Sequence, residues 1–237
     1  MSDDSPFVFR FSTLEDGQMP NASEDDPVRR DHLKHFLHKA GFDLERSNQL
    51  SLAHESGIFV LRRDGSYGKV AKTDGVIVPD ARQVWGRVVV MSLADCFPVF
   101  LEDKVRRIAG LVHAGWRGTL AKIVPSLVEL MVSYGSTPHD ITAIIGPGIR
   151  SCHLEIRRDG CLEAFIKKGY GGEEFVHSEG ELYFADLPAI FMNQLRSEGV
   201  TDAIDTEECT FCLEQKYPSF RRDGNGNRFA AYIGAKT

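Results

Sequence analysis

The chain has 237 residues, of which 42% are hydrophobic and 26% charged, and its formal net charge is −6. This apolar fraction can build a core, which excludes a disordered or fibrous protein, and the length suits one large domain or two small ones. The mild acidity argues against a nucleic-acid-binding protein, which would need a basic face. We find no apolar stretch of about 20 residues, and residues 1–6 are acidic and lack the apolar region of a signal peptide. We therefore expect a cytoplasmic protein without a membrane span or signal peptide.

In the first part of the chain, a polar loop and a helix are expected to precede a series of buried strands. The polar stretch from Glu15 to Arg30 predicts a long surface loop before the first helical pattern. Pro27 begins the predicted helix and Gly41 ends it, because proline is favoured in the first turn and glycine after the last. Short apolar runs typical of buried strands follow at residues 58–61, 76–78, 88–93, 99–101, 108–113 and 141–145.

Two further helices are predicted in the second half of the chain, at residues 119–134 and 187–198. Pro125 should kink the first, whereas Asp186 and Gly199 delimit the second as N-cap and terminator. Strand-like runs at residues 203–204 and 229–233 complete the pattern. Helices and strands mix without strict alternation, and no linker separates them. We therefore predict one layered α/β domain, residues 1–237, with a mixed β-sheet.

Two polar motifs follow buried apolar runs and carry the first candidate functional residues. Residues 94–98 (ADCFP) follow the run that ends at Leu93, and residues 113–118 (HAGWRG) follow Val112. Functional side chains are often presented at strand ends, where a rigid scaffold fixes the loop. Two neighbouring strands that end at the same edge would bring Cys96 and His113 together. His54, just before the 58–61 run, is a third candidate.

Two imidazoles and one thiolate are a suitable ligand set for zinc and leave a fourth position open. Copper also accepts these ligands, so the residue types do not choose the metal. Two other interpretations stay open at this point. Cys96 and His113 could form a nucleophile–base dyad that Asp95 or another carboxylate orients. Each residue could also be a buried structural side chain.

The HAGWRG motif and a later segment are candidate anion sites. Gly115 and Gly118 allow unusual backbone angles and close approach of a ligand. A helix start beside Arg117 would suit phosphate, although an ordinary surface arginine at a tight turn fits the same pattern. Later in the chain, Ser219 and Arg221 precede a glycine-rich turn and form a second candidate.

The cysteines do not form a disulfide framework, because their number is odd and they are spread through a long chain. They are Cys96, Cys152, Cys161, Cys209 and Cys212. The last two form a single CxxC motif. Without a second pair this motif is weak evidence for zinc, and we interpret it as structural.

Several segments together resemble the laccase-domain family, also described as multicopper polyphenol oxidoreductases. Its bacterial members are described as purine nucleoside phosphorylases and some as peptidoglycan editing factors. The resembling segments are residues 73–76, 94–99, 113–118, 146–149 with Glu155 after them, 209–210 and 219–222. The resemblance extends from about His54 to the end, and HAGWRG with an upstream ADC is its most specific part. Leu52 and Leu14 depart from the family pattern, which usually has glutamine and arginine there.

The resemblance implies a three-layer α/β/α fold similar to cysteine hydrolases of the toxin-deamidase type. It also implies one zinc ion held by His54, Cys96 and His113. Copper is the other metal expected for this ligand set. A multicopper oxidase, however, needs paired His-x-His motifs, and none occurs among the 8 histidines of this chain. The term laccase is therefore a poor description of its chemistry.

The activity that the resemblance implies is phosphorolysis of purine nucleosides, with adenosine deamination as a second reaction. The partners would be a nucleoside, such as adenosine, inosine, guanosine or methylthioadenosine, and phosphate. The rival functions are a metal-independent Cys–His hydrolase or deamidase, a copper-dependent polyphenol oxidoreductase, and a non-catalytic protein of envelope quality control. The candidate substrate- and phosphate-binding residues are Arg117, Arg221, Ser219, Asp74, Asp95 and Glu155, and the last three are also the candidate proton donors to the purine.

Overall fold

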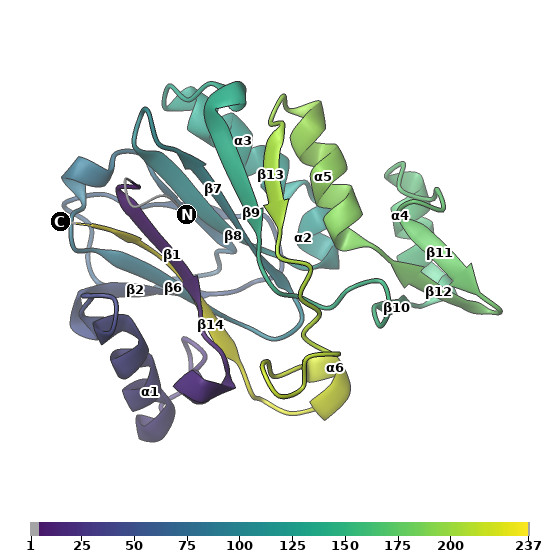
Figure 1. Ribbon diagram of the computed structural model, residues 1–237, viewed down its shortest axis with the longest axis horizontal. Helices are drawn as coiled ribbons and strands as arrows, with labels where there is room; N and C mark the ends of the chain where they lie inside the picture. Colours follow the sequence, from purple (N-terminus) through teal and green to yellow (C-terminus); the bar gives the residue numbers. More distant parts are fainter. Residues whose placement is uncertain (1–4, 237) are drawn as a thin grey trace.

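Two stacked β-sheets form the centre of the computed structural model, which describes residues 5–236 (Figure 1). The first sheet is ordered β1-β14-β6-β2-β4. Its strands β1, β14 and β6 are antiparallel neighbours, whereas β6, β2 and β4 run parallel. Their bounds are Phe7–Phe11 for β1, Ser47–Ser51 for β2, Gly68–Ala71 for β4, Val88–Leu93 for β6 and Phe229–Ala235 for β14.

The second sheet has six strands in the order β13-β9-β7-β8-β5-β3. The four central strands pair with one another antiparallel, whereas the edge strand β13 pairs in parallel with β9 and the edge strand β3 pairs in parallel with β5. The bounds are Ile58–Val60 for β3, Gly75–Val78 for β5, Phe97–Asp103 for β7, Ile108–Ala114 for β8, Ile141–Ile145 for β9 and Asp202–Asp205 for β13.

Helices cover the outer face of each sheet. α1 (Pro27–His38) packs on the five-stranded sheet, and α2 (Trp116–Leu120), α3 (Ile123–Ser133) and α5 (Leu187–Ser197) pack on the six-stranded sheet. A small sheet, with α4 (Glu163–Lys167) beside it, projects at the right of Figure 1. Its strands are β10 (Glu155–Ile156), β12 (Leu182–Ala185) and β11 (Val176–Glu179). The short α6 (Phe220–Asp223) precedes β14.

Short helical turns complete the description. The 3₁₀ turns are Leu14–Asp16, Leu44–Arg46, Ala81–Gln83 and Pro138–Asp140, and a π-helical turn spans Arg158–Leu162. Within residues 5–236, every helix is too short or too polar to cross a lipid bilayer.

The alternation of side chains along β6 explains why both of its faces are buried. Val89 and Met91 point into the core between the two sheets, whereas Val88 and Val90 point outward against α1. The sequence of β6 is therefore continuously apolar, because one face of the strand packs against the other sheet and the opposite face packs against α1. On β8, Leu111 likewise faces the other sheet while its neighbours face α3.

The predicted α/β class with mixed sheets is confirmed, but the implied three layers are four. The apolar runs that we expected to form one sheet are divided between two, with a shared core that contains Met91 and Leu111. Because each sheet still needs a cover on its outer face, one helical layer lies on each side. The predicted helix at 187–198 is confirmed as α5. The predicted helix at 119–134 is divided into α2 and α3 at Lys122, whose φ is 61°. Pro125 therefore falls in the first turn of α3, where its missing N–H costs no hydrogen bond.

The chain passes repeatedly between the two sheets, and this path places the functional residues. Three loops run from the five-stranded to the six-stranded sheet, at residues 52–57, 72–74 and 94–96. They leave β2, β4 and β6, which are parallel to one another, so all three loops lie at the same edge. That edge carries the candidate site.

Candidate metal centre and substrate cavity

His54, Asp74 and Cys96 lie one on each of the three crossing loops. The backbone bends sharply there: φ is 60° at His54 and 77° at Asp95, both in the left-handed region that non-glycine residues rarely adopt. The Asp95 side chain holds its own turn. Its Oδ1 accepts from the Thr210 hydroxyl at 2.8 Å, and its Oδ2 accepts from the Arg221 N–H at 2.7 Å.

Asp74 is fully buried, and its carboxylate holds both the His54 loop and the His113 ring. It accepts from the N–H groups of His54 and Glu55 at 2.8 and 2.9 Å, and its Oδ1 lies 2.9 Å from His113 Nδ1. Burial opposes the charged carboxylate, but these hydrogen bonds outweigh it and lower the pKa of Asp74. An ionised Asp74 thus accepts a hydrogen bond from the Nδ1–H group of His113, which leaves Nε2 of that ring free for another partner.

His54, Cys96 and His113 converge as predicted, and we refer to them as the cavity cluster. Their ligand atoms lie within 4.8 Å of one another, and the two imidazole rings meet edge to face. Antiparallel pairing of β7 with β8 brings Cys96 to His113, since Phe97 lies opposite Ala114. Burial disfavours the charged form of His113, but Cys96 and Asp74 raise its pKa to about 9. Burial and the neighbouring His113 lower the pKa of His54.

This donor set fits one transition-metal ion. Zinc and copper both accept imidazole and thiolate, and catalytic zinc sites use three protein ligands with one position open. The same geometry also places Cys96, His113 and Asp74 in the order of a nucleophile, a base and an orienting carboxylate. His54 has a role in the first arrangement and none in the second.

The glycines of the HAGWRG motif serve close packing rather than an unusual backbone. A Cβ atom on Gly115 would lie 2.7 Å from Cys96 Sγ, and one on Gly118 would lie 3.2 Å from the Glu55 carbonyl oxygen. Neither glycine has a positive φ. Because these two residues have no side chain, the motif can pack directly against the loops that carry Cys96 and Glu55.

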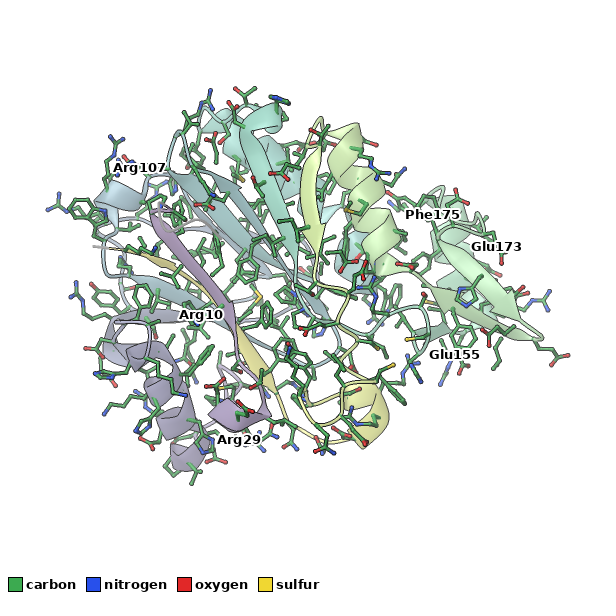
Figure 2. The ribbon with its side chains drawn as sticks, in the orientation of Figure 1. Arg10, Arg29, Arg107, Glu155, Glu173 and Phe175 are labelled. Carbon is green, nitrogen blue, oxygen red and sulfur yellow. The ribbon has the colours of Figure 1, made fainter. Side chains whose placement is uncertain are left out.

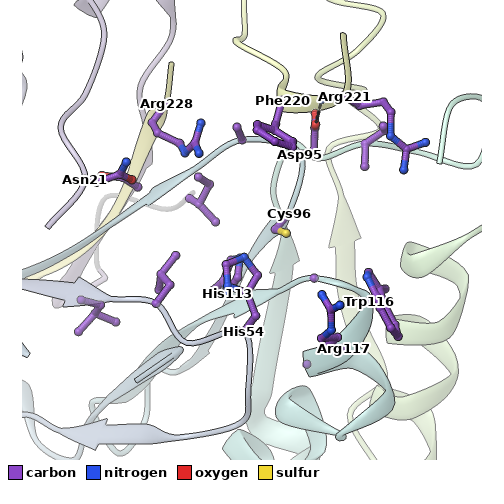
Figure 3. A pocket seen from close by; sticks show the side chains of 18 of the residues that line it. Asn21, His54, Asp95, Cys96, His113, Trp116, Arg117, Phe220, Arg221 and Arg228 are labelled. Atoms are coloured by element: carbon purple, nitrogen blue, oxygen red, sulfur yellow. Dashed lines mark hydrogen bonds between the residues drawn. The ribbon is translucent and has the colours of Figure 1, made fainter. Parts of the chain in front are cut away.

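The cavity cluster lies at a cavity of about 620 Å³ (Figure 3). This volume is within the range of roughly 300–1,000 Å³ that small-molecule sites occupy. Three arginines line the cavity: Arg117 on α2, Arg221 on α6, and Arg228 just before β14. Asp95 is the one carboxylate among the lining residues that the structure describes, so the wall is positively charged.

The three arginines are held in different ways. The Arg117 guanidinium stacks on the Trp116 ring, 4.4 Å from its centroid, and no carboxylate among residues 5–236 forms an ion pair with it. Arg221 donates to the carbonyl oxygens of His153 and Glu155 at 3.3 and 3.2 Å. Burial lowers the pKa of Arg228, although the nearby Asp95 and Cys96 act against this shift. An anion in the cavity would thus meet charge from several sides.

The other predicted residues are not all at the cavity surface. Ser219 caps α6, where its hydroxyl accepts from the Arg222 N–H at 3.2 Å. Glu155 is exposed on the small sheet, at the same end of the molecule as Glu173 and Phe175 (Figure 2). Neither it nor Ser219 nor Asp74 is among the lining residues. Asp95 does line the cavity, but both of its oxygens accept hydrogen bonds from the chain.

Sequence reasoning missed Asn21, Phe220 and Arg228 as lining residues. Phe220 lies beside the predicted Arg221, and its ring is 56% exposed, which is unusual for a phenylalanine. Asn21 falls in a stretch that was predicted only as a surface loop. Nothing in the local sequence around Arg228 marks it, since it reaches the cavity only because β14 pairs with β6.

Comparison with known proteins places the chain among named relatives. A purine nucleoside phosphorylase of Clostridium acetobutylicum is 30% identical over 233 residues, which span 97% of this chain and 92% of that protein. A purine nucleoside phosphorylase of Rickettsia conorii is 32% identical over 175 residues, or 73% of this chain and 70% of that protein.

Solved structures share the fold. YlmD from Geobacillus stearothermophilus superposes with a TM-score of 0.89 at 23% identity, over 100% of this chain and 94% of that one. YfiH from Bacillus licheniformis superposes with a TM-score of 0.86 at 23% identity, over 97% of this chain and 93% of that one. Residues 15–236 match the family model described as multi-copper polyphenol oxidoreductase laccase. With this match and the relatives above, the chain belongs to that family.

Proposed function

We propose that this protein is a zinc-dependent purine nucleoside phosphorylase. The observation that carries the proposal is the position of three candidate metal ligands, His54, Cys96 and His113, at a cavity that three arginines line. A reaction between a nucleoside and phosphate needs both a polarising centre and a site for an anion. The relatives named purine nucleoside phosphorylase support the same reaction class.

Phosphorolysis forms a bond between a phosphate oxygen and C1′ of the ribose while the bond from C1′ to the purine nitrogen breaks. The electron pair of the broken bond leaves with the purine. Arg117 and Arg228 would bind the phosphate through charge-assisted hydrogen bonds and direct it toward C1′. Zinc held by His54, Cys96 and His113 would supply Lewis acidity at its open position.

The purine would be bound by the apolar part of the cavity. Phe220 offers an exposed ring on which a base can stack, and the Arg228 guanidinium lies 5.8 Å from the centre of that ring. Leu52, the departure from the family pattern, also lines the cavity. It makes the wall beside His54 apolar where an amide would offer hydrogen bonds. Leu14, the other departure, lines a different surface hollow.

Asp74 and Asp95 act as positioning residues in this scheme, and neither would donate a proton to the purine. Asp74 is buried beneath the cavity cluster and orients His113. Asp95 joins the Cys96 turn to Thr210 and to the start of α6. The two aspartates hold the three candidate ligands and the Arg221 backbone in their positions.

A metal-independent hydrolase is the second candidate, because Cys96, His113 and Asp74 also have the arrangement of a catalytic triad. In that reaction the Cys96 sulfur would attack an amide carbonyl carbon, and His113 would pass the thiol proton to the amine as the C–N bond breaks. Water would then hydrolyse the resulting thioester and free Cys96. Adenosine deamination at the metal would leave a different product, inosine with free ammonia.

Product analysis separates these functions. Metal-replete protein is incubated with adenosine or inosine, with and without phosphate, and free base, ribose 1-phosphate and ammonia are measured. The proposal requires base and ribose 1-phosphate in equal amounts and only when phosphate is present. Ammonia without base would indicate deamination. If metal-free protein hydrolyses amides and alkylation of Cys96 stops it, the hydrolase is correct. No turnover of any of these substrates would support a non-catalytic role.

A further inference from the structure

A second group of metal-binding side chains lies outside the cavity, on the loops around α6. Cys152 and His153 come from the loop after β9, and Cys209 and Cys212 come from the CxxC motif after β13. We call these four residues the rim cluster. Their ligand atoms all lie within 4.8 Å of one another. The function proposed above uses none of them.

Four of the six distances between ligand atoms of the rim cluster are close to the edges of a tetrahedral zinc site. Cys152 Sγ lies 3.7 Å from Cys209 Sγ and 3.6 Å from Cys212 Sγ. His153 Nδ1 lies 3.2 Å from Cys152 Sγ and 3.3 Å from Cys212 Sγ. Zinc bonds of about 2.3 Å to sulfur and 2.0–2.1 Å to nitrogen give tetrahedral edges of about 3.8 Å between sulfurs and about 3.5 Å between sulfur and nitrogen.

Neighbouring groups support the ligands of the rim cluster as the outer coordination shell of a metal site would. The backbone N–H groups of Arg150 and Cys212 donate to Cys209 Sγ, which is how a metal-bound thiolate is commonly supported. The His153 ring stacks on Phe211 at 3.9 Å with an interplanar angle of 16°, so its orientation is fixed. Three sulfurs and one ring nitrogen are a preferred donor set for structural zinc.

We propose that Cys152, His153, Cys209 and Cys212 bind a second zinc ion with a closed, structural coordination shell. This ion joins two loops that are far apart in the sequence, and both loops contact residues of α6. The His153 carbonyl accepts from Arg221, and the carbonyls of Thr210 and Phe211 accept from Arg222 at 2.9 and 2.8 Å. The metal therefore fixes the rim from which Arg221 faces the cavity.

Metal analysis of four forms of the full chain tests this proposal. Wild-type protein that is purified with zinc and without chelator should hold two zinc ions per chain. The double variant Cys152→Ser/Cys212→Ser should hold one fewer, and both of its changed residues are exposed, so the core is not disturbed. Cys161→Ser is the matched control, since Cys161 is outside both clusters, and should match wild type. Cys96→Ala should lose only the zinc of the cavity cluster.

A spectroscopic measurement identifies the ligands without relying on the cavity cluster. His54→Ala/Cys96→Ala protein, loaded with Co²⁺, should show sulfur-to-cobalt charge-transfer absorption and the visible bands of a tetrahedral ion. Adding Cys152→Ser should remove or strongly reduce that absorption. If the Co²⁺ spectrum lacks these bands, the proposal is wrong. It is also wrong if intact-mass analysis of metal-replete wild type shows a disulfide among these cysteines. Neither result depends on nucleoside turnover.

Discussion

The cavity cluster presents three ligand side chains at the wall of a 620 Å³ cavity, whereas the rim cluster presents four ligand side chains between two surface loops. Both combine histidine with cysteine. The first has two imidazoles and one sulfur, and the second has three sulfurs and one imidazole. A set of three leaves a coordination position for a substrate, and a set of four closes the shell. Ligand count and access therefore predict chemistry at one place and structural support at the other.

The two clusters also differ in how their ligands are held. The cavity cluster depends on a buried charge, because Asp74 fixes both the His113 ring and the backbone at His54. The rim cluster is held by backbone N–H groups and by the stacked Phe211 ring. A single buried carboxylate is a more vulnerable support than several backbone donors, since one substitution removes it.

Cys96→Ala should separate the two clusters most strongly. It removes a ligand of the cavity cluster, so base release should fall by more than about 100-fold, beyond the usual cost of disturbing an outer partner. The rim zinc should remain, because none of its ligands changes. Parallel measurement of phosphorolysis and zinc content checks this, with Cys161→Ser as the control. Loss of both zinc ions together would mean that the clusters are not independent.

Arg117→Ala should affect phosphate and leave both metals in place. Losing a charge-assisted contact costs on the order of 1.5–3 kcal/mol, so apparent phosphate affinity should fall roughly 10- to 150-fold. The KM for the nucleoside should change much less. The control is Arg30→Ala, an exposed arginine that pairs with Glu45 and does not line the cavity. An unchanged KM for phosphate would remove Arg117 from the proposed phosphate site.

Asp74→Asn tests the buried support of the cavity cluster. Outer-sphere partners of metal-bound histidines typically contribute 10- to 100-fold, so zinc affinity at this cluster should fall by about that factor. Competition with a chelating dye measures this affinity in the presence of an intact rim cluster. Excess zinc should restore most of the activity. If zinc affinity is unaltered, Asp74 supports only the fold.

Cys212→Ser should have the smallest effect on turnover. It loosens the loop whose His153 carbonyl accepts a hydrogen bond from Arg221, which lines the cavity beside the two proposed phosphate-binding arginines. The change is worth about one hydrogen bond, so kcat/KM for phosphate should fall about 2- to 12-fold. The apparent Tm should fall as well, because a ligand of the proposed structural metal is gone. A larger loss of turnover than in Arg117→Ala would show that the rim contributes directly to the reaction.

Much of the cavity cluster could be predicted from sequence, whereas the rim cluster could not. The ADC and HAGWRG motifs each follow an apolar run, and the pairing of β7 with β8 brings them together. Cys209 and Cys212 were visible as a CxxC motif, but their partners Cys152 and His153 lie in another loop with no spacing rule to connect them. The contact arises only because Gly148 and Cys209 form a β-bridge.

The fold shows the same limit. Runs with strong apolar character, such as β6 and β8, were located well. β2 (SNQLS) and β4 (GKVA) have too few apolar residues to be recognised. β2 becomes a strand because it pairs in parallel with β6, and β4 then pairs in parallel with β2. Without these strands, the division of the chain into two sheets could not be foreseen. β1 (FVFRF) carries a strand signal that periodicity could have found.

The three crossing loops have a consequence for how the proposed metal site is assembled. His54, Asp74 and Cys96 each lie where the chain leaves one sheet for the other, and His113 ends a strand of the second sheet. The β7–β8 hairpin brings Cys96 to His113, but His54 and Asp74 join them only when β3 and β5, which are distant in sequence from that hairpin, pair into the same sheet. The complete set of candidate ligands is thus assembled late in folding, and a partly unfolded chain does not offer the proposed metal site as a whole. The centre becomes competent only in molecules whose core is already assembled.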